Sequence, residues 1–344
     1  MKYIILSSIL SLFVLTACVL QDGKQIKTTV VNDENYALAE TQVIFTKYEK
    51  QIAAATKTNG VGVFLHNKKG ANPKDHTVMR INFDTLYSFA IVDLNEDLTL
   101  IMPETGGRYQ SAWIITEEHY NPMAIEKPGL YTLTKKNVGN RYAMIVVRTQ
   151  ANTADPADLL KANQLQDKLK IKQKDRGSYI ASNNWNMDEI LKMRAKYMGY
   201  AKNMSTNVMF GKKGEVPLKE HNTGTATGWG GLTPKQAVYP TYFPTSTEHQ
   251  TLTLKNVPIK AFWSITVYDD KGFPKTDTYN INSQFAAKNK DGSVTINFGG
   301  DKNGKNYMEI FKGWNFTLRL YQPTEDYFNG KWIKPELKIV KNKK

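Results

Sequence analysis

Cysteine is the scarcest residue of this 344-residue sequence, because Cys18 is its only one. A single thiol cannot form an intramolecular disulfide, and the zinc sites that proteins build from several cysteines are excluded as well. The sequence also has no H-E-x-x-H or G-x-S-x-G spacing, which are typical of zinc metalloproteases and of α/β-hydrolases. The common signatures of metal-dependent and serine-dependent hydrolysis are therefore absent.

Long apolar runs are equally scarce. The clearest one extends from Tyr3 to Val14, directly after Lys2. This run is too short to span a membrane as mature structure, but it has the length of a signal-peptide core. It leads into Leu15-Thr16-Ala17-Cys18, which resembles the lipobox of bacterial lipoprotein signal peptides. We therefore expect export, cleavage before Cys18 and acylation of its thiol. The alternative is an ordinary signal peptide whose cleavage site contains a cysteine by chance.

The lipobox also predicts a compartment and a partner. Acylation of Cys18 attaches the chain to a membrane of the bacterial cell envelope and uses its only thiol. Val19 follows in place of an aspartate, which favours the periplasmic side of the outer membrane over the inner membrane. The stretch from about Leu20 to Glu34 is polar and unpatterned, as expected of a tether.

Negative charge is in short supply, and the formal net charge is +14. The lysines are spread along the whole chain and form no arginine–aromatic cluster of the kind that follows a nucleic-acid backbone. Export argues against nucleic acid as well, so we predict none as a partner. The basic charge favours solubility, with attraction to anionic envelope polymers as the alternative.

Hydrophobic periodicity predicts a mainly β (α+β) fold, in which two antiparallel β domains are joined by a helical segment. Helical spacing is found over Tyr36–Thr56, after Asp155-Pro156 and after Asn186, whereas alternation predicts most other segments to be strands. The predicted divisions are a signal peptide (1–17), a tether (18–34), an N-terminal β domain (35–150), a helical segment (151–205), a Gly/Pro-rich connection (206–247) and a C-terminal β domain (248–344).

Several blocks carry a family resemblance. The stretch Arg80 to Ser88, with Pro103 to Ser111 and the glycine-rich stretch Gly224 to Gly231, is similar to the domain of unknown function 1254. The stretch Phe262 to Tyr268, with Arg319 to Pro323, is similar to the companion domain of unknown function 1214. The resemblance implies paired β-sandwich or jelly-roll-like domains, and it supplies no catalytic residues.

The most informative polar cluster is the stretch around Arg80. If Val78–Asp84 is a strand, its period of two places Arg80, Asn82 and Asp84 on one face. Arg80 could then bind a ligand carboxylate or phosphate, with Asp84 accepting from a hydroxyl and Tyr87 supplying a stacking face. The alternative, which the usual pairing of buried charges favours, is an Arg80–Asp84 pair that ties two sheets together without a ligand.

Further candidates lie in the family-like blocks, namely Arg108, His119 and Trp229 as ligand-binding residues. Three histidines directly follow a glutamate, as in Glu118-His119. Neighbouring residues of a strand point to opposite faces, so such pairs are poorly placed to share a metal, and we predict no metal site and no cofactor. An EF-hand-like spacing from Asp93 to Glu104 has Leu98 where the loop requires glycine, and we interpret it as coincidence.

Two functions from different classes fit these observations. The first is a membrane-anchored envelope module that binds a small anionic or glycan-like ligand, or a partner, between its β domains near Arg80, Asp84, Tyr87 and His119. The second is a hydrolase or lyase that uses Asp84 and His119 as acid–base groups, which requires both side chains to reach a common water. The sequence leaves enzymatic activity and oligomeric state unassigned.

Overall fold

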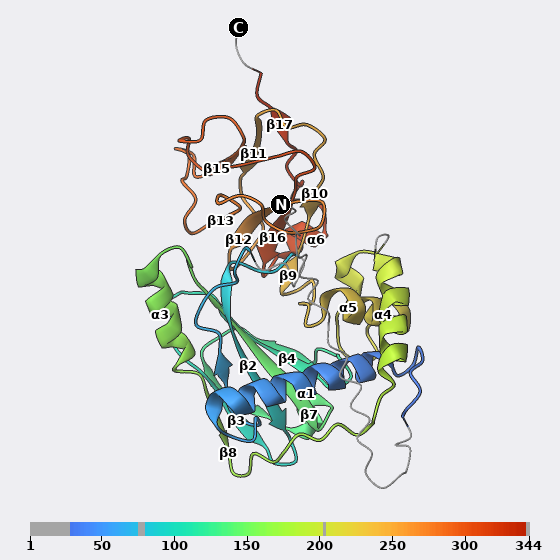
Figure 1. The fold of residues 1–344 in the computed structure, drawn as a ribbon. Helices are drawn as coiled ribbons and strands as arrows, with labels where there is room; N and C mark the ends of the chain where they lie inside the picture. Colours follow the sequence, from blue (N-terminus) through green and yellow to red (C-terminus); the bar gives the residue numbers. More distant parts are fainter. Residues whose placement is uncertain (1–27, 75–79, 202–203, 342–344) are drawn as a thin grey trace, which may run out of the picture.

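The computed structural model describes residues 28–74, 80–201 and 204–341. The lipobox-like segment and Cys18 therefore lie outside the described residues. Figure 1 shows two β-rich halves, with the C-terminal half above the N-terminal half and α4 and α5 beside their junction. No helix of the described residues is long and apolar enough to cross a membrane.

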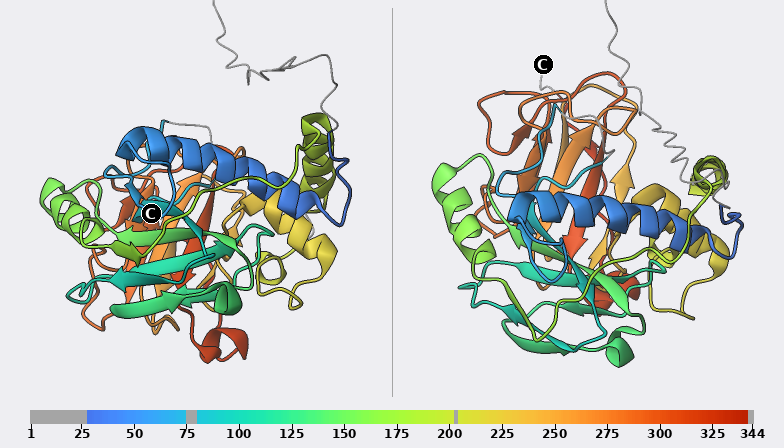
Figure 2. Two further views of the ribbon diagram at one scale, coloured as in Figure 1. Left: turned by 90° about the horizontal axis from the view of Figure 1, so that it is seen from below. Right: turned by 60° about the horizontal axis from the view of Figure 1, so that its bottom comes forward.

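The N-terminal half is built on an antiparallel sheet with the strand order β1-β2-β7-β4-β5. Both of its faces are covered, which explains why every residue of β4 and β7 is buried. One face packs on the sheet β6-β3-β8, and the other carries helix α1 through Phe45 and Ile52. Figure 2 shows α1 running along this face. The elements are α1 (Tyr36–Thr56), β1 (Leu65–His66), β2 (Thr85–Asp93), β3 (Leu98–Met102), β4 (Gln110–Thr116), β5 (Met123–Ile125), β6 (Gly129–Leu133), α2 (Lys135–Val138), β7 (Tyr142–Gln150) and β8 (Lys170–Gln173).

The C-terminal half is a sandwich of two sheets. One has the order β10-β16-β12-β13, with β9 paired to β16, and the other has the order β15-β14-β11-β17. Leu252 and Phe298 of one sheet share an apolar core with Ile265 and Leu318 of the other. The elements are β9 (Ala237–Val238), β10 (Thr241–Tyr242), β11 (Gln250–Leu254), β12 (Trp263–Tyr268), β13 (Asn280–Asn282), β14 (Val294–Phe298), β15 (Tyr307–Met308), β16 (Asn315–Tyr321), α6 (Glu325–Phe328) and β17 (Lys338–Ile339).

Aromatic packing joins the two halves. Tyr109 and Trp113 of the N-terminal half share a core with Phe262 and Tyr321 of the C-terminal half. Phe262 stacks on Tyr321 with ring centroids 4.2 Å apart, and Tyr109 meets both rings within 5.6 Å. The two halves are therefore joined by a packed aromatic contact.

The mainly β, α+β fold class is confirmed. The helix over Tyr36–Thr56 is present with the predicted bounds. The predicted start of α3 (Pro156–Gln166) is also correct, because the Asp155 side chain accepts from the Ala157 N–H at 2.9 Å. Helix α4 (Met187–Ala201) follows Asn186, as expected.

Three expectations of local structure were wrong. Residues 80–84 are not a strand, since β2 begins only at Thr85 and Arg80 has a left-handed φ of 51°. Strand β8 lies inside the segment predicted to be helical, where it pairs with β3. The Gly/Pro-rich connection contains the short helix η1 (Thr206–Val208) and helix α5 (Leu218–Gly228), which takes up most of the glycine-rich block Gly224–Gly231.

Candidate functional site

A cavity of about 470 Å³ lies where the N-terminal sheet, the end of α5 and the C-terminal sheet meet. Among the described residues of its wall there are three arginines and no aspartate or glutamate. Positive charge therefore surrounds this space without a carboxylate in the wall. The lining residues are Arg80, Ile81, Asn82, Tyr87, Arg148, Thr206, Met209, Phe210, Thr227, Gly228, Trp229, Gly230, Gly231, Leu232, Tyr239, Thr241, Thr317 and Arg319.

Arg148 is the most unusual residue of this wall. It lies on β7 and is only 7% exposed. Its Nη2 donates to the Gly230 carbonyl at 3.1 Å and its guanidinium lies 5.4 Å from the Tyr87 ring centroid, but its Nη1 has no hydrogen-bond partner among the described residues. Buried cations are normally paired with a carboxylate, because desolvation is costly. A buried guanidinium with an unused N–H beside a cavity indicates a place for an anion.

Arg319 and Arg80 extend the same cationic wall. Arg319, on β16, donates to Thr266 Oγ1 at 2.8 Å and to the Tyr268 hydroxyl at 2.5 Å. It also donates at 3.0 Å to the carbonyl of Arg80, whose own guanidinium donates to Asn315 Oδ1 at 2.6 Å. These hydrogen-bond acceptors are uncharged and orient both arginines. Asp84 acts electrostatically on Arg319, and Asp269 acts on Arg80, but neither carboxylate lines the cavity.

Asp84 lies behind this wall and is fully buried. Its carboxylate accepts from Ser264 Oγ at 2.5 Å and from Asn280 Nδ2 at 3.2 Å. Burial raises the pKa of Asp84, while the nearby charge of Arg319 opposes that shift. Asp84 does not itself line the cavity, so no carboxylate of the described residues belongs to the wall that holds the arginines.

Arg80, Asn82 and Asp84 do not form the predicted row on one strand face, because residues 80–84 are not a strand. Asp84 and Arg80 make no hydrogen bond or ion pair with each other among the described contacts, so the expectation of a direct pair is wrong. Asn82 Nδ2 donates to the Tyr321 hydroxyl at 2.9 Å. All three side chains bond to the C-terminal half and so tie the two halves together, but without the direct Arg80–Asp84 pair that the alternative predicted.

His119 is also buried behind the wall and is held in a single tautomer. Its Nε2 accepts from the Gly230 N–H at 3.0 Å, so its Nδ1 carries the proton and donates to Thr225 Oγ1 at 2.7 Å. Burial, and next the neighbouring His221, hold the pKa of His119 well below its usual range. Because the Gly230 carbonyl in turn accepts from Arg148, His119 helps to fix the direction of that guanidinium.

Asp84 and His119 do not form the acid–base pair that a hydrolase or lyase would need. Each is hydrogen bonded to different residues, they share no partner, and neither lines the cavity. Both ring nitrogens of His119 are occupied. The described geometry therefore gives that alternative no support.

The other predicted residues fall in two places. Tyr87 and Trp229 line the cavity, and Trp229 stacks on His119 with centroids 5.4 Å apart. Arg108 lies elsewhere: it forms an ion pair with Asp158 of α3 and donates to the Gln150 carbonyl at 2.8 Å. Of the predicted ligand-binding residues, Arg80, Asn82, Tyr87 and Trp229 thus share one cavity wall.

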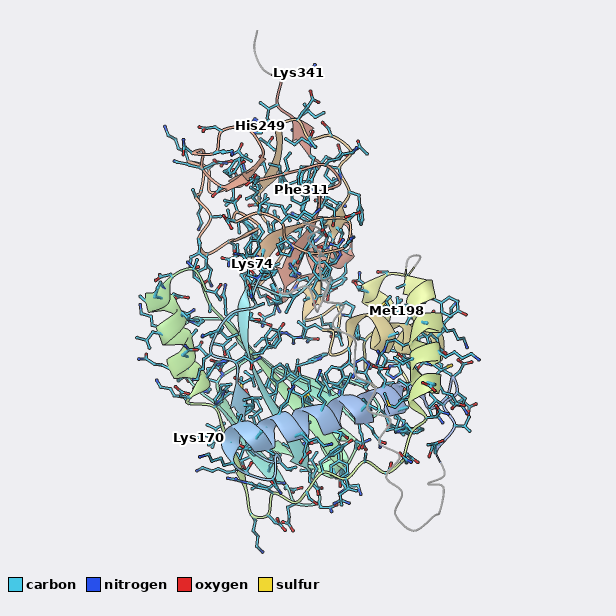
Figure 3. All side chains as sticks on the ribbon, in the orientation of Figure 1. Lys74, Lys170, Met198, His249, Phe311 and Lys341 are labelled. Atoms are coloured by element: carbon cyan, nitrogen blue, oxygen red, sulfur yellow. The ribbon has the colours of Figure 1, made fainter. Side chains whose placement is uncertain are left out.

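The described ranges contain no group of three or more His, Cys, Asp or Glu side chains placed to hold a metal ion. Of the Glu–His dipeptides, Glu118-His119 and Glu220-His221 lie side by side, with 5.7 Å between the histidine ring centroids. His221 donates from Nε2 to the Glu118 carbonyl at 3.0 Å, and His249 lies toward the far end of the C-terminal half (Figure 3). Asp93 of the EF-hand-like spacing is paired with Arg141 at 2.8 Å.

The sequence did not identify three residues that lie in the cavity wall, namely Arg148, Arg319 and Tyr239. A signal for the two arginines was present, because each interrupts an otherwise largely apolar strand, Tyr142–Gln150 or Asn315–Tyr321. An arginine at a fully buried strand position needs a compensating contact. Nothing comparable in the sequence distinguishes Tyr239.

The fold and this cavity define a two-domain, mainly β protein with a cationic pocket at the domain junction. Residues 61–173 match the family described as a protein of unknown function, DUF1254, and residues 244–325 match the protein of unknown function DUF1214. These matches confirm the resemblance of the blocks at Arg80–Ser88, Pro103–Ser111, Phe262–Tyr268 and Arg319–Pro323, whereas the block Gly224–Gly231 lies outside both matched ranges.

Two solved structures share the fold. The VPA0106 protein of Vibrio parahaemolyticus is 17% identical, with a TM-score of 0.61 over 89% of this chain and 100% of its own. An uncharacterized protein of Burkholderia cenocepacia is 12% identical, with a TM-score of 0.51 over 90% of this chain and 88% of its own. At these identities the likeness shows the fold alone. No curated protein matches the chain.

Proposed function

We propose that this protein is an envelope lipoprotein, anchored through Cys18, that binds a small organic anion in the cavity between its two halves. The observation that carries the proposal is Arg148, a buried guanidinium with one unused N–H and no carboxylate in the wall around it. A ligand carboxylate or phosphate would supply the missing acceptor and the missing negative charge. A neutral glycan fits less well, because the wall offers cations and not the carboxylates that bind hydroxyl groups.

The rest of the wall favours an anion with a flat apolar body. Phe210, Tyr87 and Trp229 present ring surfaces, and Met209 and Leu232 add aliphatic contact. Binding pockets commonly combine such apolar walls with a few polar groups that fix orientation. An aromatic carboxylate or aryl phosphate has both features.

A thermal-shift experiment with three small probes tests this proposal. Benzoate and phenyl phosphate carry the charge, whereas benzamide has nearly the shape of benzoate without it. Ligand binding raises the temperature of the unfolding midpoint by an amount set by the ratio of ligand concentration to Kd. We expect the midpoint to rise by a few °C when each anion is present at about ten times its Kd, and to rise less with benzamide at the same concentration. The relative shifts of benzoate and phenyl phosphate distinguish a carboxylate ligand from a phosphate ligand.

Two variants complete the experiment. Arg148→Met should abolish the shift. The variant should fold normally, because an apolar side chain of similar length replaces a buried charge that has no carboxylate partner. Arg176→Met is the control, since Arg176 is an exposed arginine that does not line the cavity. A full shift in Arg148→Met, or an equal shift with benzamide, would contradict the proposal.

A further inference from the structure

A second cavity, of about 620 Å³, lies beside the first, and Phe210 contributes to the walls of both. It is bounded by the loop leading into β5, by the segments around Gly211 and Pro234, and by α6. Its charged lining residues are Lys212, Glu215, Lys235 and Glu325. Two lysines and two glutamates balance one another, so this cavity, unlike the first, has no preference for an anion.

Asn121 is the exceptional residue of this second cavity. It is only 3% exposed, and its backbone N–H donates to the Gly211 carbonyl at 2.9 Å. Its side-chain Oδ1 and Nδ2 both lack a hydrogen-bond partner among the described residues. More than nine-tenths of buried polar groups in proteins are hydrogen bonded, and a carboxamide with neither end bonded is rarer still. A wholly unpartnered amide in a cavity wall indicates a ligand that supplies both an acceptor and a donor.

A peptide group has this pair of atoms side by side, since its carbonyl accepts and its N–H donates. The neighbouring backbone suits an extended peptide as well. β5 is the edge strand of the N-terminal sheet, it pairs only with β4 among the described strands, and its Met123 and Ala124 line the cavity. Peptides often bind by adding a strand to such an edge.

We propose that this second cavity binds a short extended peptide, with the Asn121 carboxamide paired to one of its peptide groups. Trp113, Met123 and Phe328 supply apolar contact for peptide side chains. The balanced charges of the wall suit a neutral backbone. This proposal is independent of the anion site, because Arg148 lies in the wall of the other cavity only.

The test uses the full mature protein and the uncharged probe N-acetyl-trialanine amide. Saturation-transfer NMR should detect binding to the wild type. Asn121→Leu keeps the size of the side chain but removes its hydrogen-bonding atoms, so this substitution should weaken peptide binding at least tenfold. Arg148→Met should bind the peptide as the wild type does. Equal binding by Asn121→Leu, or no binding by the wild type, would overturn the proposal.

A second measurement does not depend on the folding of a variant. In wild-type protein labelled with ¹⁵N-asparagine, the side-chain NH₂ signals of Asn121 should shift on titration with the peptide. The NH₂ signals of Asn222, a buried asparagine whose Nδ2 already donates to the Asp33 carbonyl at 2.7 Å, should stay in place. Unchanged Asn121 signals under saturating peptide would also overturn the proposal.

Discussion

Two buried, uncharged histidines support the wall of the anion cavity. His119 bonds to the Gly230 N–H, and His221 lies 5.7 Å from it between ring centroids. Thr225 connects them, because its hydroxyl accepts from His119 and donates to the His221 carbonyl at 3.0 Å. Burial is the main reason that the pKa of His221 falls to about 4. Neither ring can take up a proton near neutral pH without disturbing the wall.

Acid should therefore destabilise the protein through these residues. The unfolded chain takes up a proton on His221 near pH 6.5, whereas the folded chain does so only near pH 4, so the free energy of unfolding falls as the pH drops through this window. Between about pH 7 and about pH 5 the expected loss from His221 is about 2 kcal/mol. Urea denaturation at both pH values measures it, and His221→Gln should lose less stability than the wild type. An identical loss in the variant would contradict this assignment.

At the scale of residues, the sequence predicted part of the candidate site. The R-x-N-x-D pattern identified Arg80 and Asn82, and both lie in the cavity wall. Arg148 could not be placed with them, because its position opposite Tyr87 depends on the register between β2 and β7, and its acceptor Gly230 is distant in sequence. Asp84 was expected to face a ligand, but its carboxylate is used by Ser264 and Asn280.

At the scale of elements, the segment that precedes α5 contributes Phe210 to the walls of both cavities, and the end of α5 contributes Thr227 and Gly228 to the first. Helix α5 was predicted as a loop because its threonines and glycines have low helix propensity. In the structure, Thr223 and Thr227 donate to the carbonyls four residues before them, at 2.7 Å each. Gly224 lies so close to Met209 that a Cβ would be 2.8 Å from its carbonyl oxygen. Tertiary packing, which local sequence does not reveal, stabilises this helix.

Two glycines of α5 provide a matched pair of substitutions. Gly224→Ala should destabilise the protein by about 1–3 kcal/mol, because the added methyl group overlaps the backbone of Met209. Gly228→Ala should be neutral or stabilising by up to about 1 kcal/mol, because its nearest contact is the Phe210 ring at 3.4 Å and alanine favours the helix. Chemical denaturation measures both. Equal effects of the two substitutions would show that α5 does not pack closely on Met209.

The strands were easier to predict than the helices at this scale. Leu98–Met102 and Gln250–Leu254 have the predicted bounds, since alternation of apolar and polar residues determines which face is buried. Residues 80–84 share that alternation without forming a strand. Their side chains instead bond to the C-terminal half, an interaction between distant segments that no periodicity encodes.

At the scale of the whole molecule, the protein has a folded body for which we propose a lipid anchor. The described chain has no membrane-spanning helix, and the body is joined across its halves by aromatic packing and by the tie at 80–84. Cys18 is the only residue in the chain that can carry a thioether-linked lipid. The anchor would hold the cavity in the envelope, where small organic anions from outside the cytoplasm arrive.

The anchor is tested by a single substitution. Cys18→Ala should prevent acylation. Because one lipidated cysteine is the only anchoring signal proposed, the protein should then move from the membrane fraction to the soluble periplasmic fraction, or stay in its uncleaved form. Cell fractionation with immunoblotting measures the distribution, and metabolic labelling with an alkyne fatty acid detects the lipid. Labelling that persists in the variant would contradict the lipoprotein assignment.

The central claim is that the cavity at the domain junction recognises an anion through Arg148. Fluorine-detected NMR titration tests it directly, by comparing 4-fluorobenzoate with the uncharged 4-fluorobenzamide on the wild type and on Arg148→Met. A charged hydrogen bond to a buried guanidinium predicts at least about tenfold tighter binding of the benzoate by the wild type, equivalent to about 1.4 kcal/mol, and loss of that preference in the variant. Equal affinities for the two probes in the wild type, or an undiminished preference in Arg148→Met, would contradict the claim.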